Sequence, residues 1–325
     1  MMKAMTLPRR ALPFLALPAI AQPAIAQPGW PERPIRWIVN FPPGGAADTL
    51  SRILAQAIGG RLGQPVVVEN RPGAGGALGA DILAKAPGDR HLVMMSSAAS
   101  HGIGPVLYRH TPYDAVMDFT HVHLIGSFPS VLAVNAELPV HDVAGLVALA
   151  ATRPLTYGSG GNGTLNHLLG QVFARAAGIE FTHVPYRGSA PALTDAISGT
   201  LPTIMESLPI ALPHLRAGRL RALATSEQAR ADALPNVPTF AEAGFPTATA
   251  TNWFGFSLPA GVPAGSVTRW SSEMAALLAE PGVIERFAAM GVRPGTLGPA
   301  EYTGLIRAEL ERWRAVITAG RITAD

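Results

Sequence analysis

The chain has 325 residues, of which 48% are hydrophobic and 14% charged, a composition typical of a globular protein with a large buried core. It contains no cysteine, which excludes disulfide bonds, thiolate metal sites, a cysteine nucleophile and a lipid-anchoring cysteine. Basic residues outnumber acidic ones by 25 to 22, but no basic run is interleaved with aromatic residues, so nucleic acid is not expected as a partner.

The first 26 residues have the pattern of a secretory signal peptide. Lys3, Arg9 and Arg10 precede a short apolar run at 11–20, and Ala24-Ile25-Ala26 forms an A-x-A cleavage site. The apolar run is too short to span a membrane. We therefore expect export by the Sec or the twin-arginine route, cleavage near Ala26 and a mature protein in the periplasm. Without this segment the charges balance, 22 against 22.

Strand and helix patterns alternate after the signal peptide. Buried-strand runs at 35–39 and 66–68 enclose a helical pattern at 49–61, and 91–95 reads as a third strand. Strand, helix and strand in this order predict a mostly parallel sheet with right-handed crossovers. The predicted fold class is therefore α/β.

The same order of elements recurs from residue 155. In each stretch a strand leads through a glycine-rich turn, at 41–45 and at 158–163, into a helix and a second strand. Two lobes of the same local architecture are expected. The strand-like segments 130–134 and 253–258 are candidate crossings between them, and two crossings permit hinge bending around a cleft. The predicted parts are a signal peptide at 1–26, lobe 1 at 27–128 plus 255–325, and lobe 2 at 129–254.

The two glycine-rich turns are candidate anion sites. Each leads from a strand into a helix, and the first N–H groups of a helix, with its positive dipole end, attract an anion. Glycine lets a ligand oxygen approach the backbone closely. The turns follow the carboxyl ends of predicted parallel strands, where doubly wound folds bind ligands. If each lobe contributes one turn, the cleft holds two opposed anion sites, which suit a dicarboxylate or a carboxylate with a second polar group. Neither turn matches a phosphate loop or G-x-G-x-x-G.

Several polar residues near these turns have two open roles. Asp48 fits either a helix N-cap or a ligand contact. Thr164 fits either a cap or a hydrogen-bond donor to the ligand. Arg187, with Arg71 at the equivalent place in the first lobe, fits either a two-pronged contact to a carboxylate or a structural ion pair.

A hydrolase is the alternative from a different functional class. Ser159, His167 and Asp195 supply the residue types of a catalytic triad, but Ser159 lacks the G-x-S-x-G elbow. None of the nine histidines has a metal-ligand spacing such as H-E-x-x-H. We predict no catalytic residues, no cofactor and no metal.

An ordered set of motifs covers nearly the whole mature chain and resembles the Bug family, the extracytoplasmic solute receptors of tripartite tricarboxylate transporters. The set includes FPPGGAAD at 41–48, VVVENRPGAGGALGA at 66–80, YGSGGNGTLNHLL at 157–169, HVPYRGSAPAL at 183–193 and LPNVPTFAEAG at 234–244. The resemblance implies a type II periplasmic-binding-protein fold, in which two Rossmann-like lobes close around a ligand cleft, and no catalysis.

The resemblance also implies a ligand and partners. The ligand class is a small carboxylate, meaning a di- or tricarboxylate, an acidic amino acid or an aromatic acid. The partners are the membrane subunits of the transporter, with a sensor kinase as the alternative output, and a monomer is expected. The candidate ligand-binding residues are Phe41, Gly44, Gly45, Asp48, Ser96, Ser97, Ser159, Asn162, Gly163, Thr164, Tyr186, Arg187 and Glu206.

Two departures from the family pattern affect the predicted pocket. After the third strand, where the family often has Asn and Thr, this chain has small residues at 96–101. Glu206, if it faces the cleft, disfavours a ligand carboxylate beside it and favours an amine or a hydroxyl. The identity of the ligand therefore cannot be carried over from any one relative.

Overall fold

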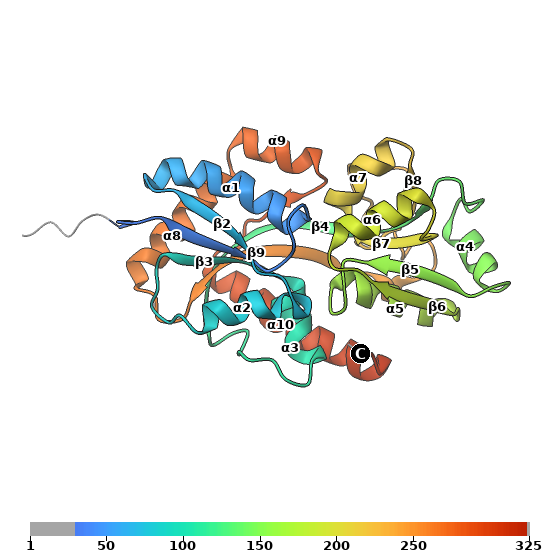
Figure 1. Ribbon diagram of the computed structural model, residues 1–325, viewed down its shortest axis with the longest axis horizontal. Coiled ribbons are helices and arrows are strands. Elements are labelled where there is room, and N and C mark those ends of the chain that lie inside the picture. Colours follow the sequence, from blue (N-terminus) through green and yellow to red (C-terminus); the bar gives the residue numbers. More distant parts are fainter. Residues whose placement is uncertain (1–29, 324–325) are drawn as a thin grey trace, which may run out of the picture.

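One mixed sheet runs through the whole protein and joins two lobes (Figure 1). The computed structural model describes residues 30–323, so the predicted signal peptide at 1–26 lies outside the described residues. The strand order is β2-β1-β3-β9-β4-β7-β5-β6, and β8 and β10 also pair with β4. Helices cover both faces of the sheet in each lobe (Figure 1). This is the expected α/β fold with two Rossmann-like lobes.

Lobe 1 is built on three parallel strands. β1 (Ile35–Val39) lies between β2 (Val66–Asn70) and β3 (Leu92–Ser97) and pairs with both. The three predicted strands are thus confirmed. α1 (Ala46–Leu62) connects β1 to β2, and α2 (Ala77–Ala84) leads from β2 to β3. The helix predicted at 49–61 is also confirmed, although it begins earlier, at Ala46.

Lobe 2 repeats this arrangement. β5 (Leu155–Ser159) lies between β6 (Phe181–Pro185) and β7 (Thr203–Ser207) and is parallel to both. The prediction of two lobes with the same local architecture is therefore confirmed. The remaining elements of this lobe are α4 (Val143–Ala150), α5 (Leu165–Ala177), α6 (Ser189–Ser198), α7 (Leu208–Arg216), β8 (Leu220–Thr225) and a 3-10 turn at Pro246–Ala248.

A single long strand, β4 (Phe119–Asn135), belongs to both lobes. From Phe119 to Pro129 it pairs antiparallel with β9 (Thr251–Pro259), which in turn pairs with β3. From Ser130 onward it pairs with β7 and β8. The change of partners lies between Pro129 and Ser130.

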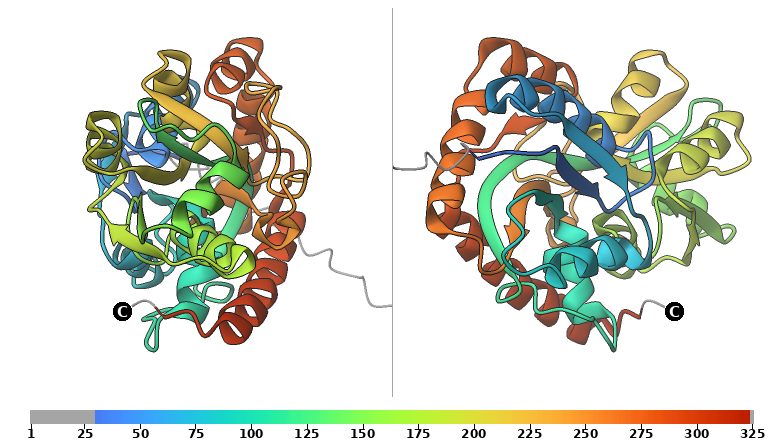
Figure 2. Two further views of the ribbon diagram at one scale, coloured as in Figure 1. Left: turned by 90° about the vertical axis from the view of Figure 1, so that its right-hand side faces the viewer. Right: turned by 60° about the vertical axis from the view of Figure 1, so that its left-hand side comes forward.

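The C-terminal helix also contacts both lobes. α10 (Pro299–Gly320) runs along one side of the molecule (Figure 2). Tyr302 and Ile306 pack near β9 in lobe 1, whereas Trp313 and Ile317 join the core of lobe 2. The elements between β3 and β4 and after β9 are a π-helical turn at Ala98–Ile103, α3 (Gly104–Leu107), α8 (Ala264–Leu278), α9 (Pro281–Ala289) and β10 (Arg293–Pro294), and a 3-10 turn at Ala74–Gly76 precedes α2.

Each lobe has its own hydrophobic core, and aromatic rings form the center of both. In lobe 1 the ring of Phe256 packs against Trp37 and Trp270, with centroids 5.0 and 4.7 Å away. In lobe 2 the rings of Tyr157 and Phe181 lie 4.6 Å apart. Within residues 30–323, no helix combines the length and the apolar character needed to cross a membrane.

The same substitution should have opposite effects on stability at two helical glycines. In α5, a Cβ at Gly170 would lie 2.2 Å from the ring of Tyr157, so Gly170→Ala should lower the free energy of unfolding by about 1–3 kcal/mol through overpacking. In α10, a Cβ at Gly304 would meet no atom within 4 Å, so Gly304→Ala should raise it by roughly 0.5–1 kcal/mol. Urea denaturation measures both; two changes of the same sign would contradict this packing.

Candidate functional site

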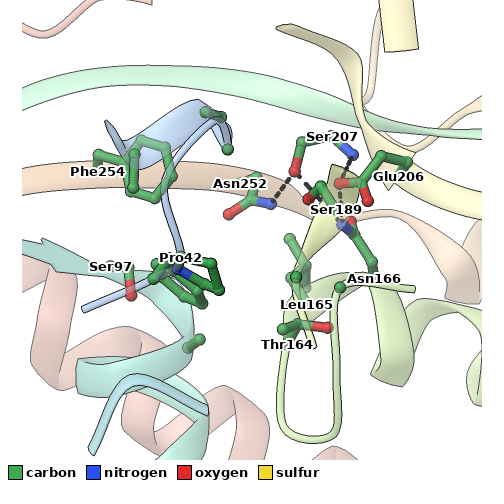
Figure 3. A pocket seen from close by; sticks show the side chains of 17 residues that line it. Pro42, Ser97, Thr164, Leu165, Asn166, Ser189, Glu206, Ser207, Asn252 and Phe254 are labelled. Carbon is green, nitrogen blue, oxygen red and sulfur yellow. Dashed lines mark hydrogen bonds between the residues drawn. The ribbon is translucent and has the colours of Figure 1, made fainter. Parts of the chain in front are cut away.

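A cavity lies between the two lobes and encloses about 540 Å³ of space, including its open mouth. In Figure 3, Pro42, Ser97 and Phe254 stand on the lobe 1 side, and Thr164 and Glu206 on the lobe 2 side. Its walls come from the segments that follow β1, β3, β5, β6 and β7, together with β9. Because parallel strands end at a common edge, this is the position expected for a ligand in a doubly wound fold.

Four helices begin at the wall of this cavity. The lining residues include Ala46 in the first turn of α1, Leu165 in that of α5, Ser189 in that of α6, and Ser207 at the N-cap of α7. No side chain caps the N-termini of α1, α6 or α7. Their first-turn N–H groups and positive dipole ends therefore favour an anion in the cavity.

The first glycine-rich turn, 41–45, is held from beneath by Asp48. The carboxylate of Asp48 accepts hydrogen bonds from Gly44 N at 3.0 Å and Asn70 Nδ2 at 2.9 Å, and pairs with Arg52 at 2.9 Å. Burial alone would raise the pKa of Asp48, but these hydrogen bonds together lower it below its ordinary value. Gly44 has φ of +81°, a conformation that favours glycine. Asp48 and Gly44 thus shape the turn, while Phe41 and Gly45 line the cavity.

The second turn, 158–163, is organised by two hydroxyl groups. Ser159 is fully buried; its Oγ lies 2.7 Å from His183 Nε2 and accepts from Gly161 N at 3.2 Å. Thr164 caps α5 by accepting from His167 N, and its hydroxyl donates to Gly161 O at 2.8 Å. Ser159 therefore supports the turn from behind, whereas Thr164 both caps the helix and lines the cavity.

The residues weighed as a catalytic triad do not pair with one another. Ser159 bonds to His183, the Nδ1 of His167 accepts from Gly163 N at 3.3 Å, and Asp195 accepts from the Tyr186 hydroxyl at 2.7 Å. Burial lowers the pKa of His183 to about 3, with a further contribution from His167, so this imidazole is neutral at pH 7. No group of histidine and acidic side chains in the described part of the chain is arranged to hold a metal ion.

A second cavity adjoins the first and shares Phe41, Pro42 and Thr164 with it. Three candidate residues, Asn162, Tyr186 and Arg187, line this adjoining space rather than the first cavity. Arg187 is exposed there, and within residues 30–323 it forms no ion pair. Its counterpart in lobe 1, Arg71, pairs with Glu69 instead.

The two serines at the end of β3 differ in position. Ser96 Oγ is buried at 2.8 Å from Ser257 Oγ and 2.7 Å from the Tyr302 hydroxyl, so Ser96 serves the packing of β3 against β9 and α10. Ser97 lines the cavity, and its Oγ accepts from Ser100 N at 3.2 Å. Gly163, at the end of the second turn, has φ of +75° and faces Tyr108 of lobe 1.

Several polar residues of the cavity were not predicted from the sequence. Asn166 and Ser189 lie in the first turns of α5 and α6, and Ser207 follows Glu206. The positions of these three residues, next to predicted turns or to Glu206, are the only features of the sequence that could have indicated them. Asn252 and Phe254 reach the cavity from β9 through its pairing with β3, in which Phe254 is opposite Ser97. No local pattern predicts that contact.

Glu206 lies at the end of β7 and is 1% exposed. Its Oε1 accepts hydrogen bonds from Ser207 N at 2.7 Å and Asn166 Nδ2 at 3.0 Å (Figure 3). Its Oε2 is buried and has no hydrogen-bond partner among the described residues. Burial raises the pKa of Glu206 to about 7 against the lowering effects of the Ser207 backbone N–H and of the nearby side chains of Ser189, Ser207 and Asn166. Glu206 is also the only ionisable side chain among the residues that line this cavity.

Comparison with known proteins agrees with this architecture. Residues 50–321 match the family model described as "Tripartite tricarboxylate transporter family receptor". The chain is 37% identical over 299 residues to a "UPF0065 protein in tcbD-tcbE intergenic region" of Pseudomonas sp. (strain P51), covering 91% of this chain and 89% of that protein. It is 37% identical over 291 residues to "Protein BugT" of Bordetella pertussis, covering 89% of each.

Solved structures give the same result. A Rhodopseudomonas palustris protein, Rpa4515 with adipate, has a TM-score of 0.87 and 35% identity, covering 90% of this chain and 99% of that one. MatC from the same species, with bound malate, has a TM-score of 0.84 and 28% identity, covering 89% and 100%. The periplasmic binding protein BugD has a TM-score of 0.86 and 25% identity, covering 90% and 99%. The resemblance to the Bug family is therefore confirmed.

The buried carboxyl of Glu206 should make the wild-type protein less stable as the pH rises. Glu206→Gln should lack this contribution. The pKa of Glu206 is about 7 in the folded protein, against an ordinary value of 4.5. The contribution of the protonated carboxyl to the free energy of unfolding is therefore complete below pH 4.5 and is lost as the pH rises through 7. Between pH 5 and pH 8, wild type should therefore lose on the order of 2 kcal/mol of stability relative to Glu206→Gln.

Urea denaturation of both proteins at pH 5, 6, 7 and 8 measures this difference. Glu311→Gln on the exposed side of α10 controls for the loss of one negative charge. Parallel stability profiles for wild type and Glu206→Gln would show that the carboxyl does not titrate in this way.

Proposed function

The chain belongs to the family of tripartite tricarboxylate transporter receptors, and we propose that it captures a small carboxylate in the interlobe cavity for delivery to the membrane subunits of such a transporter. Receptors of this family are periplasmic solute-binding proteins and not enzymes. We further propose that this chain is exported to the periplasm, is cleaved near Ala26 and acts as a monomer.

One observation carries the proposal: four helix N-termini, three of them without a side-chain cap, converge on a cavity lined by no cationic side chain. An anion in this position would be stabilised by backbone N–H groups and helix dipoles from both lobes. Serine, threonine and asparagine side chains supply further donors. The small acids named for the similar solved structures, adipate and malate, belong to the ligand class that such a cavity would suit.

The proposal includes a division of roles among the candidate residues. Those that line the first cavity would contact the ligand, and the candidates that shape the turns would position them. Asn162, Tyr186 and Arg187 would meet a larger ligand that extends into the adjoining cavity. The proposed contacts are Phe41, Gly45, Ser97, Thr164, Asn166, Ser189, Glu206 and Ser207, and the proposed supporting residues are Gly44, Asp48, Ser96, Ser159 and Gly163.

Closure of the two lobes over the ligand is the expected binding step. We propose that 27–128 plus 255–325 and 129–254 are the two bodies that move. Two contacts between the lobes support a closed arrangement. The Tyr108 hydroxyl donates to Asn162 O at 3.1 Å, and Gly188 approaches Pro42 so closely that a Cβ on it would lie 2.9 Å from the proline ring.

A small carboxylate should stabilise the purified protein against heat. Ligand present at 100 times its dissociation constant adds about 2.7 kcal/mol to the free energy of unfolding, which raises the melting temperature. A thermal-shift screen of small mono-, di- and tricarboxylates, amino acids and aromatic acids measures this, with sugars and inorganic cations as the comparison set. A shift with a sugar or a cation and with no carboxylate would contradict the proposed function.

Gly45→Val should weaken carboxylate binding without unfolding the protein. Gly45 is the N-cap of α1 with φ of −82°, and a Cβ there would lie 3.7 Å from its nearest neighbour, Pro42 O. The backbone therefore tolerates a side chain, but the added methyl groups would enter the cavity. We expect at least a tenfold loss of affinity by calorimetry, with a melting temperature near that of wild type.

Gly298→Val is the matched control for this variant. Gly298 is the N-cap of α10 with φ of −76°, and a Cβ there would meet nothing within 4 Å. It lines neither of the two adjoining cavities. Gly298→Val should bind the acid with the affinity of wild type. Equal affinities for wild type, Gly45→Val and Gly298→Val would exclude the first turn from the binding site.

A further inference from the structure

The bonding pattern of Glu206 leaves one of its oxygens for a ligand. Oε1 already accepts two hydrogen bonds, from Ser207 N and Asn166 Nδ2. The amide of Asn166 is fixed in that orientation because its Oδ1 accepts from Ser130 Oγ at 2.6 Å. Oε2 makes no hydrogen bond of good geometry within the described residues although Glu206 is 1% exposed and lines the cavity. The hydroxyl of Ser189, which also lines the cavity, lies close enough to lower the pKa of this carboxyl and would compete with a ligand donor for it. A buried carboxyl oxygen without a partner is costly, so a ligand group at this place is strongly favoured.

The hydroxyl of Ser207 next to it has the opposite polarity. Its Oγ accepts from Asn166 Nδ2 at 3.3 Å and from Asn252 Nδ2 at 3.4 Å. With both acceptor positions occupied, the hydroxyl hydrogen is what Ser207 has to donate. Its acceptor is either the adjacent carboxyl of Glu206, whose pKa the Ser207 side chain helps to lower, or a ligand in the cavity that Ser207 faces (Figure 3). This end of the cavity therefore offers a donor at Ser207 beside an acceptor at Glu206.

The balance of charge decides which ligand group meets Glu206. No lysine, arginine or histidine lines the cavity. Above the pKa of Glu206, which is about 7, a ligand carboxylate beside it would therefore place two anions together with no cation to separate them, whereas below it the protonated carboxyl would itself donate a hydrogen bond. A hydroxyl or an ammonium group would instead donate to Oε2. The ligand's own carboxylate would then lie against the helix N-termini.

We propose that the ligand is a hydroxy or amino carboxylate, which presents a hydroxyl or ammonium hydrogen to Glu206 Oε2 while its carboxylate is held by the helix N-termini. This inference rests on the proposed function and narrows its ligand class. It makes Glu206 the residue that separates substituted acids from their unsubstituted analogues. A site built to bond a ligand donor rejects an analogue that lacks it, because the buried acceptor is then left unpaired.

Matched ligand series test this inference. In each series one position carries hydrogen, hydroxyl or ammonium: propanoate, 2-hydroxypropanoate and 2-aminopropanoate; butanedioate, 2-hydroxybutanedioate and 2-aminobutanedioate; benzoate, 2-hydroxybenzoate and 2-aminobenzoate, whose amine is neutral at pH 7. Calorimetry at pH 7.5 gives the affinities. In the series that binds tightest, the hydroxy or amino acid should bind at least tenfold more tightly than the unsubstituted acid. Comparison of the hydroxy acid with the amino acid then shows whether a hydroxyl or an ammonium group is the preferred donor.

Two variants connect the preference to the carboxyl. Glu206→Gln keeps the side-chain shape but offers an amide, so the preference should fall below threefold. Ser97→Ala, on the lobe 1 side of the cavity, should weaken all members of a series by a similar factor and leave the preference intact. The pH-dependent stability difference of Glu206→Gln serves as a folding control.

The outcomes separate this inference from the proposed function. An unsubstituted acid that binds as tightly as both substituted members, or a preference that survives in Glu206→Gln, would overturn the role of Glu206 and leave carboxylate binding in place. Absence of binding by every acid in the three series and in the thermal-shift screen would overturn both.

Discussion

The hydrogen bonding of β4 fixes the two lobes relative to each other. Its first part pairs with β9 and β10 and its second part with β7 and β8, so the two lobes share one strand. Because each lobe places the carboxyl ends of its parallel strands toward the other, this shared strand brings the helices after β1, β5, β6 and β7 to one cavity. A slip in the register of β4 would separate the two halves of the site.

The cavity can attract an anion without using a positively charged side chain. Backbone N–H groups at helix ends cannot titrate or swing away, and they present donors in fixed directions. Burying an arginine there would require a partner for its charge, whereas helix ends have no net charge to neutralise. Glu206 departs from this design, since it places an acid among groups that favour anions. Such a departure at a buried position is the reason for the proposed role of Glu206 in ligand selection.

The sequence predicted the turns, strands and helices that form the cavity walls. The turns at 41–45 and 158–163 follow from glycine next to strand and helix patterns, which are properties of neighbouring residues. Asp48 was harder to assign, because α1 begins at Ala46 and so places this residue inside its first turn. Asn252 could not be predicted, since it reaches the cavity from β9, a strand distant in the chain from β1 and β3. Lobe packing, and not local pattern, decides such contacts.

The distribution of the four helix ends has a kinetic consequence. α1 belongs to lobe 1, and α5, α6 and α7 belong to lobe 2, so the combined field exists only while the lobes are together. When they part, the ligand loses the opposing dipole and gains water in one event, without an ion pair that must first dissociate. For the proposed function, the residence time of the ligand would then be governed by the rate of lobe opening, and a partner that pulled the lobes apart would also empty the site.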